Sequence, residues 1–330
     1  MKNLANSVAN QDTARQTAQH IAPEQAKINS VTLVYVPIYL GGPHRGTSMG
    51  PAAMRVAGIR ERIESMGFKV EQEVEISCPQ SVCWLDRTDK KPKCIPEIMQ
   101  VSLEVAVAVE SAMEAGTIPI TIGGDHSIAI GSLAGVSSYY RKRNQKFGCV
   151  WFDAHGDINT PETSGSGNVH GMPFAVSLGY GDKGLVDLLG YSPKVDAKRS
   201  ALVGIRDIDP GERDMINRSG VTAFSMRDMD YMGLSKVNEL VASTVATETD
   251  GIHVSFDLDV MDPDLAPGVS TPARGGLTYR EASISLALLC ETGLLRSIDI
   301  AELNPANDVR SRSADLAVDL VATCLGNTIL

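Results

Sequence analysis

Two short runs of the sequence carry closely spaced aspartate and histidine residues that could bind metal ions. The run DAHGD places Asp153, His155 and Asp157 at alternate positions, and the run SFDLD places Asp257 and Asp259 two residues apart. In an extended segment, alternate side chains point to the same side of the chain. Each run therefore predicts a group of polar side chains on one side, which is the arrangement that a bound cation needs.

A histidine in the run GGDHS, His126, completes a candidate set of four carboxylates and two imidazoles. So many carboxylates in one place need cations to offset their negative charge. Two divalent ions would supply four positive charges and would generate hydroxide from water near neutral pH. Oxygen-rich ligands with two histidines and no cysteine favour Mn²⁺ or a similar six-coordinate ion over structural zinc. The alternatives are separate surface acids, or a calcium site, for which the EF-hand spacing is absent.

Apolar runs that alternate with helical patterns must position these residues. The runs rich in β-branched residues are 31–38, 118–124, 147–157, 199–210, 251–263 and 294–305, and helical spacing is found over 52–67 and 95–116. Continuously apolar strands between helices are typical of a parallel sheet covered on both faces, so the predicted fold class is α/β. Ligands of open α/β sheets bind outside the carboxyl ends of the strands, where these polar residues lie.

Composition excludes several other kinds of protein. The chain has 330 residues, of which 43% are hydrophobic and 21% charged, and this profile is typical of a globular protein. A net charge of -10 argues against a nucleic-acid partner and favours a small cationic one. No stretch approaches the roughly 20 apolar residues that cross a bilayer, and no apolar leader is present, which predicts a cytoplasmic protein without a membrane partner. We expect a polar arm over residues 1–28 and a single catalytic domain over 29–330.

Six cysteines spread over the chain are too sparse for a disulfide framework and form no C-x-x-C pair. They are predicted to be reduced thiols. A redox-sensitive disulfide stays open as an alternative only among Cys78, Cys83 and Cys94.

Four segments, GGDHSIAIGS, DAHGDINTP, SGNVHGMPF and SFDLDVMDPDLAPGVSTPARGGLTYRE, resemble the ureohydrolases, the binuclear manganese amidinohydrolases that include arginase and agmatinase. The resemblance runs from about Val31 to the C-terminus. It implies a three-layer α/β/α fold with a central, mainly parallel sheet, and two Mn²⁺ ions per subunit, with Co²⁺ as a possible substitute. The implied ligands are His126, Asp153, Asp157 and Asp257 for one ion, and Asp153, His155, Asp257 and Asp259 for the other.

The same resemblance implies roles for further residues. A hydroxide that bridges the ions would attack the guanidinium carbon of the substrate. Glu302 in IAELNP resembles the glutamate that clamps the guanidinium group, since a carboxylate can pair bidentately with that planar fork. His170 in GNVHG matches the family's proton shuttle, a role that suits imidazole because its pKa lies near neutrality. Asp157 joins these two as a catalytic residue.

Specificity for the rest of the substrate depends on two further segments. Asn159, Ser166 and Asn168 offer neutral donors for an α-carboxylate, while Asp209 and Glu212 offer acids for an α-ammonium group. Both segments resemble the arginase pattern, and turn chemistry is the alternative for the first. These residues favour arginine over agmatine, which lacks the carboxylate.

The predicted reaction is hydrolysis of L-arginine to L-ornithine and urea. A hydrolase of agmatine or of a guanidino acid is the alternative within the family. A binuclear metallophosphoesterase is disfavoured because its G-D-x-x-D and G-N-H-E patterns are absent. A non-catalytic scaffold that metals stabilise is the last alternative. The resemblance further implies a homo-oligomer, either a trimer or a hexamer.

Overall fold

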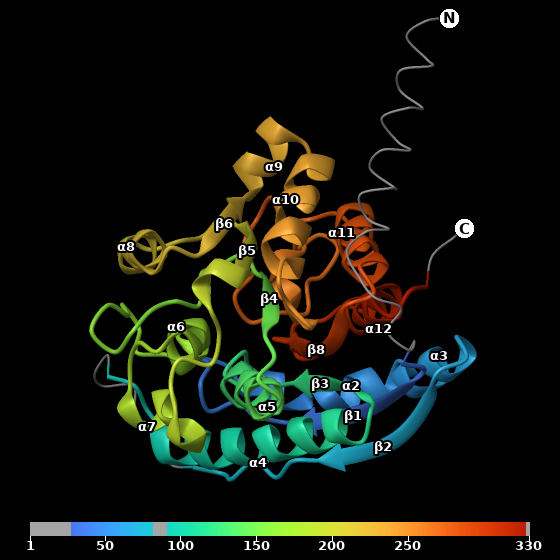
Figure 1. Cartoon of the computed structure of the whole chain (residues 1–330), viewed down its shortest axis with the longest axis horizontal. Coiled ribbons are helices and arrows are strands. Elements are labelled where there is room, and N and C mark those ends of the chain that lie inside the picture. Colours follow the sequence, from blue (N-terminus) through green and yellow to red (C-terminus); the bar gives the residue numbers. More distant parts are fainter. Residues whose placement is uncertain (1–27, 82–90, 328–330) are drawn as a thin grey trace, which may run out of the picture.

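The computed structural model describes residues 28–81 and 91–327, and an eight-stranded sheet is the centre of this part of the chain. Every pair of neighbouring strands is parallel, in the order β2-β1-β3-β8-β7-β4-β5-β6. Figure 1 shows β2 at one end of the sheet and β6 at the other. The predicted α/β class with a parallel central sheet is therefore confirmed. The strands are β1 (Ser30–Val36), β2 (Lys69–Glu75), β3 (Ile118–Gly123), β4 (Phe147–Phe152), β5 (Ser200–Ile205), β6 (Thr222–Ser225), β7 (Gly251–Asp257) and β8 (Leu295–Ala301).

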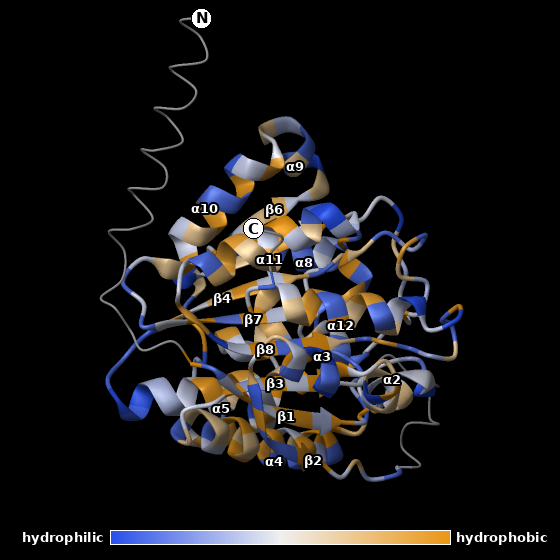
Figure 2. Ribbon diagram, turned by 90° about the vertical axis from the view of Figure 1, so that its right-hand side faces the viewer, coloured by the Kyte–Doolittle hydropathy of each residue, from blue (hydrophilic) through white to orange (hydrophobic). Residues whose placement is uncertain are grey.

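Alternate residues of the central strands pack into two separate hydrophobic cores, one on each face of the sheet. In β4, Val150 and Phe152 belong to one core, and Cys149 and Trp151 belong to the other. Figure 2 shows β4, β7, β8, β3 and β1 in succession, coloured mostly as hydrophobic residues. Burial on both faces explains why these strands are recognisable in the sequence as unbroken apolar runs.

Helices cover both faces of the sheet and form the outer two layers. One core includes residues of α2 (Gly50–Val56), α3 (Ile59–Ser65), α10 (Leu234–Ala246), α11 (Tyr279–Glu291) and α12 (Arg312–Cys324). The other core includes residues of α4 (Ile95–Glu114), α5 (Ile128–Lys142) and α6 (Pro173–Leu178). The helices α7 (Lys183–Val186), α8 (Pro210–Ser219) and α9 (Met226–Met232) lie in the connections.

Two details differ from the sequence-based expectation. The single helix predicted over residues 52–67 is two helices, because Gly58 adopts a left-handed conformation with φ 80° and separates α2 from α3. Strands β2 and β6 were not predicted. The first is a mostly exposed edge strand with charged residues, which protect an edge from pairing, and the second has only four residues.

The strand order brings distant parts of the chain to one edge. Strands β3 and β4 follow each other in sequence, but β8 and β7 lie between them in the sheet. The carboxyl ends of β3, β8, β7, β4 and β5 therefore stand side by side. All the metal-ligand candidates lie at these ends or in the residues that follow them.

Some sequence expectations concern other parts of the chain. The proposed polar arm lies almost entirely outside the described residues, as does Cys83. Cys94 is disulfide-bonded, so the expectation of reduced thiols is wrong there, whereas Cys78, Cys149, Cys290 and Cys324 are free. Among the helices of residues 28–81 and 91–327, none combines the length and apolarity that crossing a bilayer requires.

Candidate metal centre

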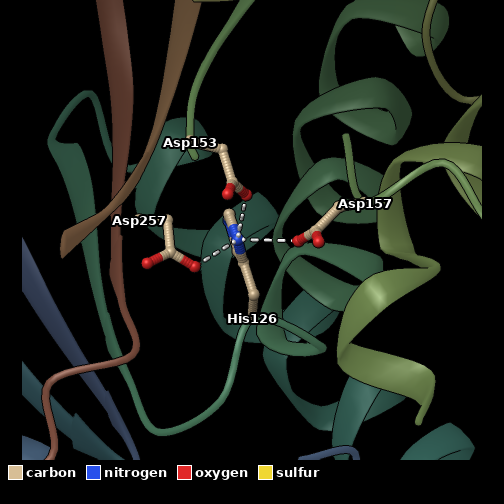
Figure 3. A group of neighbouring side chains, drawn as sticks. All are labelled: His126, Asp153, Asp157 and Asp257. Carbon is tan, nitrogen blue, oxygen red and sulfur yellow. Dashed lines mark ion pairs between the residues drawn. The ribbon is translucent and has the colours of Figure 1, made fainter. Parts of the chain in front are cut away.

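His126 lies at the centre of the first group of candidate ligands. Its Nδ1 atom is 3.3 Å from Asp153 Oδ2, 3.0 Å from Asp157 Oδ2 and 3.1 Å from Asp257 Oδ2 (Figure 3). All four side chains are buried. Three carboxylates that converge on one imidazole nitrogen in a buried site form a pocket of ligand atoms suited to a divalent cation.

A second group lies directly beside the first. His155 Nδ1 is 3.3 Å from Asp153 Oδ1 and 3.1 Å from Asp259 Oδ2. Asp153 contributes one oxygen to each group and so connects them. Asp257 is part of the first group, and its Oδ1 accepts a hydrogen bond of 2.8 Å from the backbone N–H of Asp259. Its suggested contact with the second ion stays a prediction.

The DAHGD segment reaches this arrangement by a turn. Strand β4 ends at Phe152, and the backbone bends at Ala154 and His155, so the expected alternation of an extended chain is wrong here. The His155 N–H donates to Asp153 Oδ1 at 2.7 Å, which closes the turn. Asp157 has a positive φ of 48°, an uncommon conformation for a residue other than glycine. Such strain is found mostly at functional sites, where surrounding contacts maintain it.

Neighbouring side chains that were not among the predicted site residues hold the ligands in place. Ser255 Oγ lies 2.9 Å from His126 Nε2, the Trp151 ring stacks on the imidazole at 4.2 Å, and the indole N–H donates to Asp153 Oδ2 at 2.9 Å. Thr271 Oγ1 donates to Asp259 Oδ2 at 3.0 Å. Ser255 and Trp151 precede Asp257 and Asp153 by two residues, so period-two alternation could have indicated the first two of these neighbours.

Arg206, the residue after β5, was also missed. Its guanidinium group donates to the backbone carbonyls of Asp259, Val260 and Met261, and to those of Ala273 and Arg274. The hydrogen bonds of this planar guanidinium group stabilise the turn that contains Asp259. In the RDID segment, only the acids were predicted to contribute to the site.

The buried polar atoms of the site fit a metal ion. His126 Nδ1 and Asp157 Oδ2 are buried and lack a hydrogen-bond partner within the described structure. Because Ser255 engages Nε2, the Nδ1 lone pair of a neutral imidazole is directed at the carboxylates. Burial and the charge of Asp153 raise the pKa of Asp157 to about 8, so its carboxylate is costly without a cation. A divalent ion removes this cost for both atoms.

His170 and Glu302 form a pair next to the first ligand group. His170 Nδ1 is 2.8 Å from Glu302 Oε1, which also accepts a 2.9 Å hydrogen bond from the His126 backbone N–H. Burial disfavours the charged imidazolium, but Glu302 outweighs it and raises the pKa of His170 to about 9. Glu302 Oε2 is buried without a hydrogen-bond partner in the described region, and the residue has φ 64°. A buried, unpaired carboxylate oxygen in a strained residue is suited to a cationic ligand.

The residues predicted to bind the rest of the substrate belong to two segments that touch. Asn159 Nδ2 donates to Asp209 Oδ2 at 2.8 Å. Asp209 and Glu212 form a capping box at the start of α8, and Glu212 Oε1 also accepts from the Gly156 N–H at 3.0 Å. Ser166 is exposed, and its Oγ accepts from the Asn168 N–H at 3.2 Å. The structure thus joins three of the five residues and leaves Ser166 and Asn168 in an outer loop.

Together these features define a binuclear ligand site at the carboxyl edge of a parallel α/β sheet. A family model for the arginase family matches residues 29–326. Arginase from Brevibacillus brevis is 40% identical over 303 residues, which cover 91% of this chain and 99% of that protein. The structure of Bacillus caldovelox arginase matches with a TM-score of 0.86 and 38% identity, over 92% of this chain and all of that one. That of Entamoeba histolytica arginase in complex with L-ornithine has a TM-score of 0.82 and 30% identity, over 91% and 99%. The chain belongs to the arginase family.

Metal binding should raise the stability of the protein. An ion present at a hundred times its Kd adds about 2.7 kcal/mol to the free energy of unfolding, because it binds only the folded ligand group. We expect the Tm of the chelator-treated protein to rise on addition of Mn²⁺, and the rise to shrink in Asp157→Asn. Asp230→Asn is the matched control, since Asp230 is an exposed acid of α9 outside both ligand groups. A Tm that Mn²⁺ leaves unchanged would contradict the site.

Proposed function

We propose that the chain hydrolyses L-arginine to L-ornithine and urea with two Mn²⁺ ions. The observation that carries the proposal is the pair of ligand groups that share Asp153, within a fold of the arginase family. His126, Asp153, Asp157 and Asp257 would hold one ion, and Asp153, His155, Asp257 and Asp259 the other. When bound, the ions lower the pKa of a water molecule and so supply the nucleophile near neutral pH. A screen of urea release from several guanidino compounds, together with metal analysis, tests this proposal.

Glu302 is proposed to orient the guanidinium group of the substrate. Its Oε2 atom is buried and has no partner in the described structure, while Oε1 is already engaged by His126 and His170. A planar guanidinium could therefore donate to Oε2 and offset the charge of the buried carboxylate. This contact would fix the plane of the substrate, which favours attack at its central carbon.

His170 is proposed to carry a proton during the reaction. Its Nδ1 atom is held by Glu302, which fixes the ring next to the position where the guanidinium would lie. Nε2 is then the nitrogen left to donate a proton to the leaving amine or to accept one from water. Asp157, a ligand of the first group, would keep the nucleophile oriented.

Specificity for arginine is proposed to come from the outer residues. Asn159, Ser166 and Asn168 would bind the α-carboxylate, and Asp209 and Glu212 would bind the α-ammonium group. The Asn159–Asp209 hydrogen bond supports this arrangement because it places the two segments together. The E. histolytica relative in complex with L-ornithine shows that an arginase of this fold binds the amino acid product.

Removal of one outer donor should affect arginine and agmatine differently. We expect Asn168→Ala to lower kcat/KM for arginine by about tenfold or more, mainly through KM, since a hydrogen bond to a charged group is worth about 1.5–3 kcal/mol. The value for agmatine should change little, because agmatine has no carboxylate. Kinetics of both substrates with the wild type and the variant provide the test. A wild type that prefers agmatine would reject arginine as the substrate and favour the agmatinase alternative.

The remaining expectations stay predictions. Metal analysis of the protein as purified decides between Mn²⁺ and Co²⁺, and light scattering decides between a trimer and a hexamer. The cytoplasmic location and the division into an arm over 1–28 and one catalytic domain over 29–330 are likewise proposed. Metal binding without urea release from any guanidine would favour the non-catalytic scaffold.

A further inference from the structure

Asp125 is a fully buried carboxylate whose hydrogen-bond donors in the described structure are all uncharged. Its Oδ2 accepts hydrogen bonds from the backbone N–H groups of Gly41 and Gly42, at 2.8 and 3.0 Å. Its Oδ1 accepts the N–H of Ser127 at 3.0 Å and also the hydroxyl group of Ser127. Two charges also act on it: Glu302 repels the carboxylate and His170 attracts it. A buried carboxylate whose hydrogen bonds all come from neutral groups is expensive.

Gly41 connects this carboxylate to His170. The N–H of Gly41 donates to Asp125, and its carbonyl oxygen accepts the backbone N–H of His170 at 3.1 Å. The glycine loop that follows β1 is therefore held on one side by Asp125 and holds His170 on the other. A shift of the His170 backbone relative to this loop would therefore break or strain that hydrogen bond.

The same contacts form a closed ring through the site. His170 Nδ1 is 2.8 Å from Glu302 Oε1, which accepts the N–H of His126 at 2.9 Å, and His126 follows Asp125 in the chain. The ring joins the segments after β1, β3 and β8 to the turn Val169–Gly171. Asp125 is the member of this ring that links the β1 loop to the β3 loop.

We propose that Asp125 is a positioning residue that places His170 for proton transfer, and that it acts through the backbone of Gly41. The inference rests on the proton-transfer role proposed for His170. Asp125 itself touches neither the candidate substrate position nor the ligand atoms. Its contribution is to fix the imidazole relative to Glu302, because small displacements of a catalytic group have large kinetic effects.

The residue types on both sides of the contact suit this role. A carboxylate offers two acceptor oxygens, whereas the amide of an asparagine offers one oxygen and two donors. Asp125→Asn therefore loses either the glycine contacts or the Ser127 contacts. A Cβ atom at Gly41 would lie 2.8 Å from Asp125 Oδ1, so Gly41→Ala disturbs the contact from the other side with the carboxylate still present.

A double-mutant cycle on the metal-loaded protein tests the proposal. Asp125→Asn and Gly41→Ala are each made in the wild type and in His170→Ala, and kcat, KM for arginine and bound Mn²⁺ are measured. In the wild-type background we expect kcat to fall by about tenfold or more, with KM and metal content unchanged. In the His170→Ala background we expect a further change of less than about twofold, since the two residues act as one unit.

Gly171→Ala is the matched control. It adds a methyl group beside His170 that meets no atom within 4 Å, so kcat should be retained. If Asp125→Asn fails to fold, the kcat of Gly41→Ala in the two backgrounds tests the proposal by itself. An equal loss in both backgrounds, or a loss of bound Mn²⁺, would overturn the inference, because Asp125 would then act through His126. If kcat is normal in Asp125→Asn and Gly41→Ala but low in His170→Ala, the positioning role of Asp125 is rejected and the proton-transfer role of His170 is kept. If kcat is normal in His170→Ala, both roles are rejected.

Discussion

Replacement of His170 by alanine should lower kcat for arginine by about 10²- to 10⁴-fold, the usual contribution of a general acid or base. Bound Mn²⁺ should stay at the wild-type level, because His170 belongs to neither ligand group. The physical reason is the geometry of the imidazole, whose Nδ1 is held 2.8 Å from Glu302 while Nε2 is left to move a proton. Steady-state urea release and elemental analysis of the same samples provide the two measurements.

The control for this experiment is His253→Ala. His253 is a buried histidine of strand β7 whose side chain pairs with Ser297 and Asp299, away from both ligand groups. Any loss in this variant should follow the loss of folded protein, which circular dichroism reports. If His170→Ala lost as much Mn²⁺ as a variant of a metal ligand does, its kinetic defect would be assigned to the metal site. The proposed proton-transfer role would then be rejected.

Replacement of Asp153 by alanine should have the larger effect. Asp153 gives one oxygen to each ligand group, so its removal weakens the binding of both ions at once. We expect kcat to fall by more than about 10⁴-fold, beyond the range of a single acid or base, with less than the wild-type amount of Mn²⁺ bound. Titration of the chelator-treated variant with Mn²⁺, followed by calorimetry and urea release, checks both parts.

Asp157→Asn and Asp259→Asn separate the two groups in this experiment. Asp157 belongs only to the first group and Asp259 only to the second, so each should weaken one ion more than the other. Asp264→Asn, which changes an exposed acid beyond the end of β7, is the control. Tight binding of two ions by Asp153→Ala would show that the two groups do not depend on a shared carboxylate.

Much of the fold follows from local patterns that are independent of tertiary contacts. The strands that are buried on both faces are unbroken apolar runs, and helix α4, which covers one face, matches the helical spacing over 95–116. The exceptions have physical causes. Strand β2 is exposed and charged because it lies at an edge, and Gly58 breaks a helix because it adopts a left-handed conformation that the helical pattern does not encode.

The residues of the site also divide into those that the sequence predicted and those that it did not. The six ligand candidates were identified from residue type and spacing, and the structure brings all six to one edge of the sheet. The supporting residues Ser255, Trp151, Thr271 and Arg206 were not predicted, because their residue types do not by themselves indicate a metal site. Their contribution depends on a partner that lies elsewhere in the chain.

By itself, the sequence determined which strands are buried and which carboxylates and imidazoles lie at their ends. These residue types already indicated a site for divalent ions. Only the tertiary structure decided that β8 and β7 lie between β3 and β4, and that hydrogen bonds join His126, Glu302 and His170. Local propensity acts over a few residues, whereas the hydrogen bond between His126 and Glu302 spans 176 positions. Contacts of that range are set by the order in which crossover connections place the strands, and no short sequence pattern encodes that order.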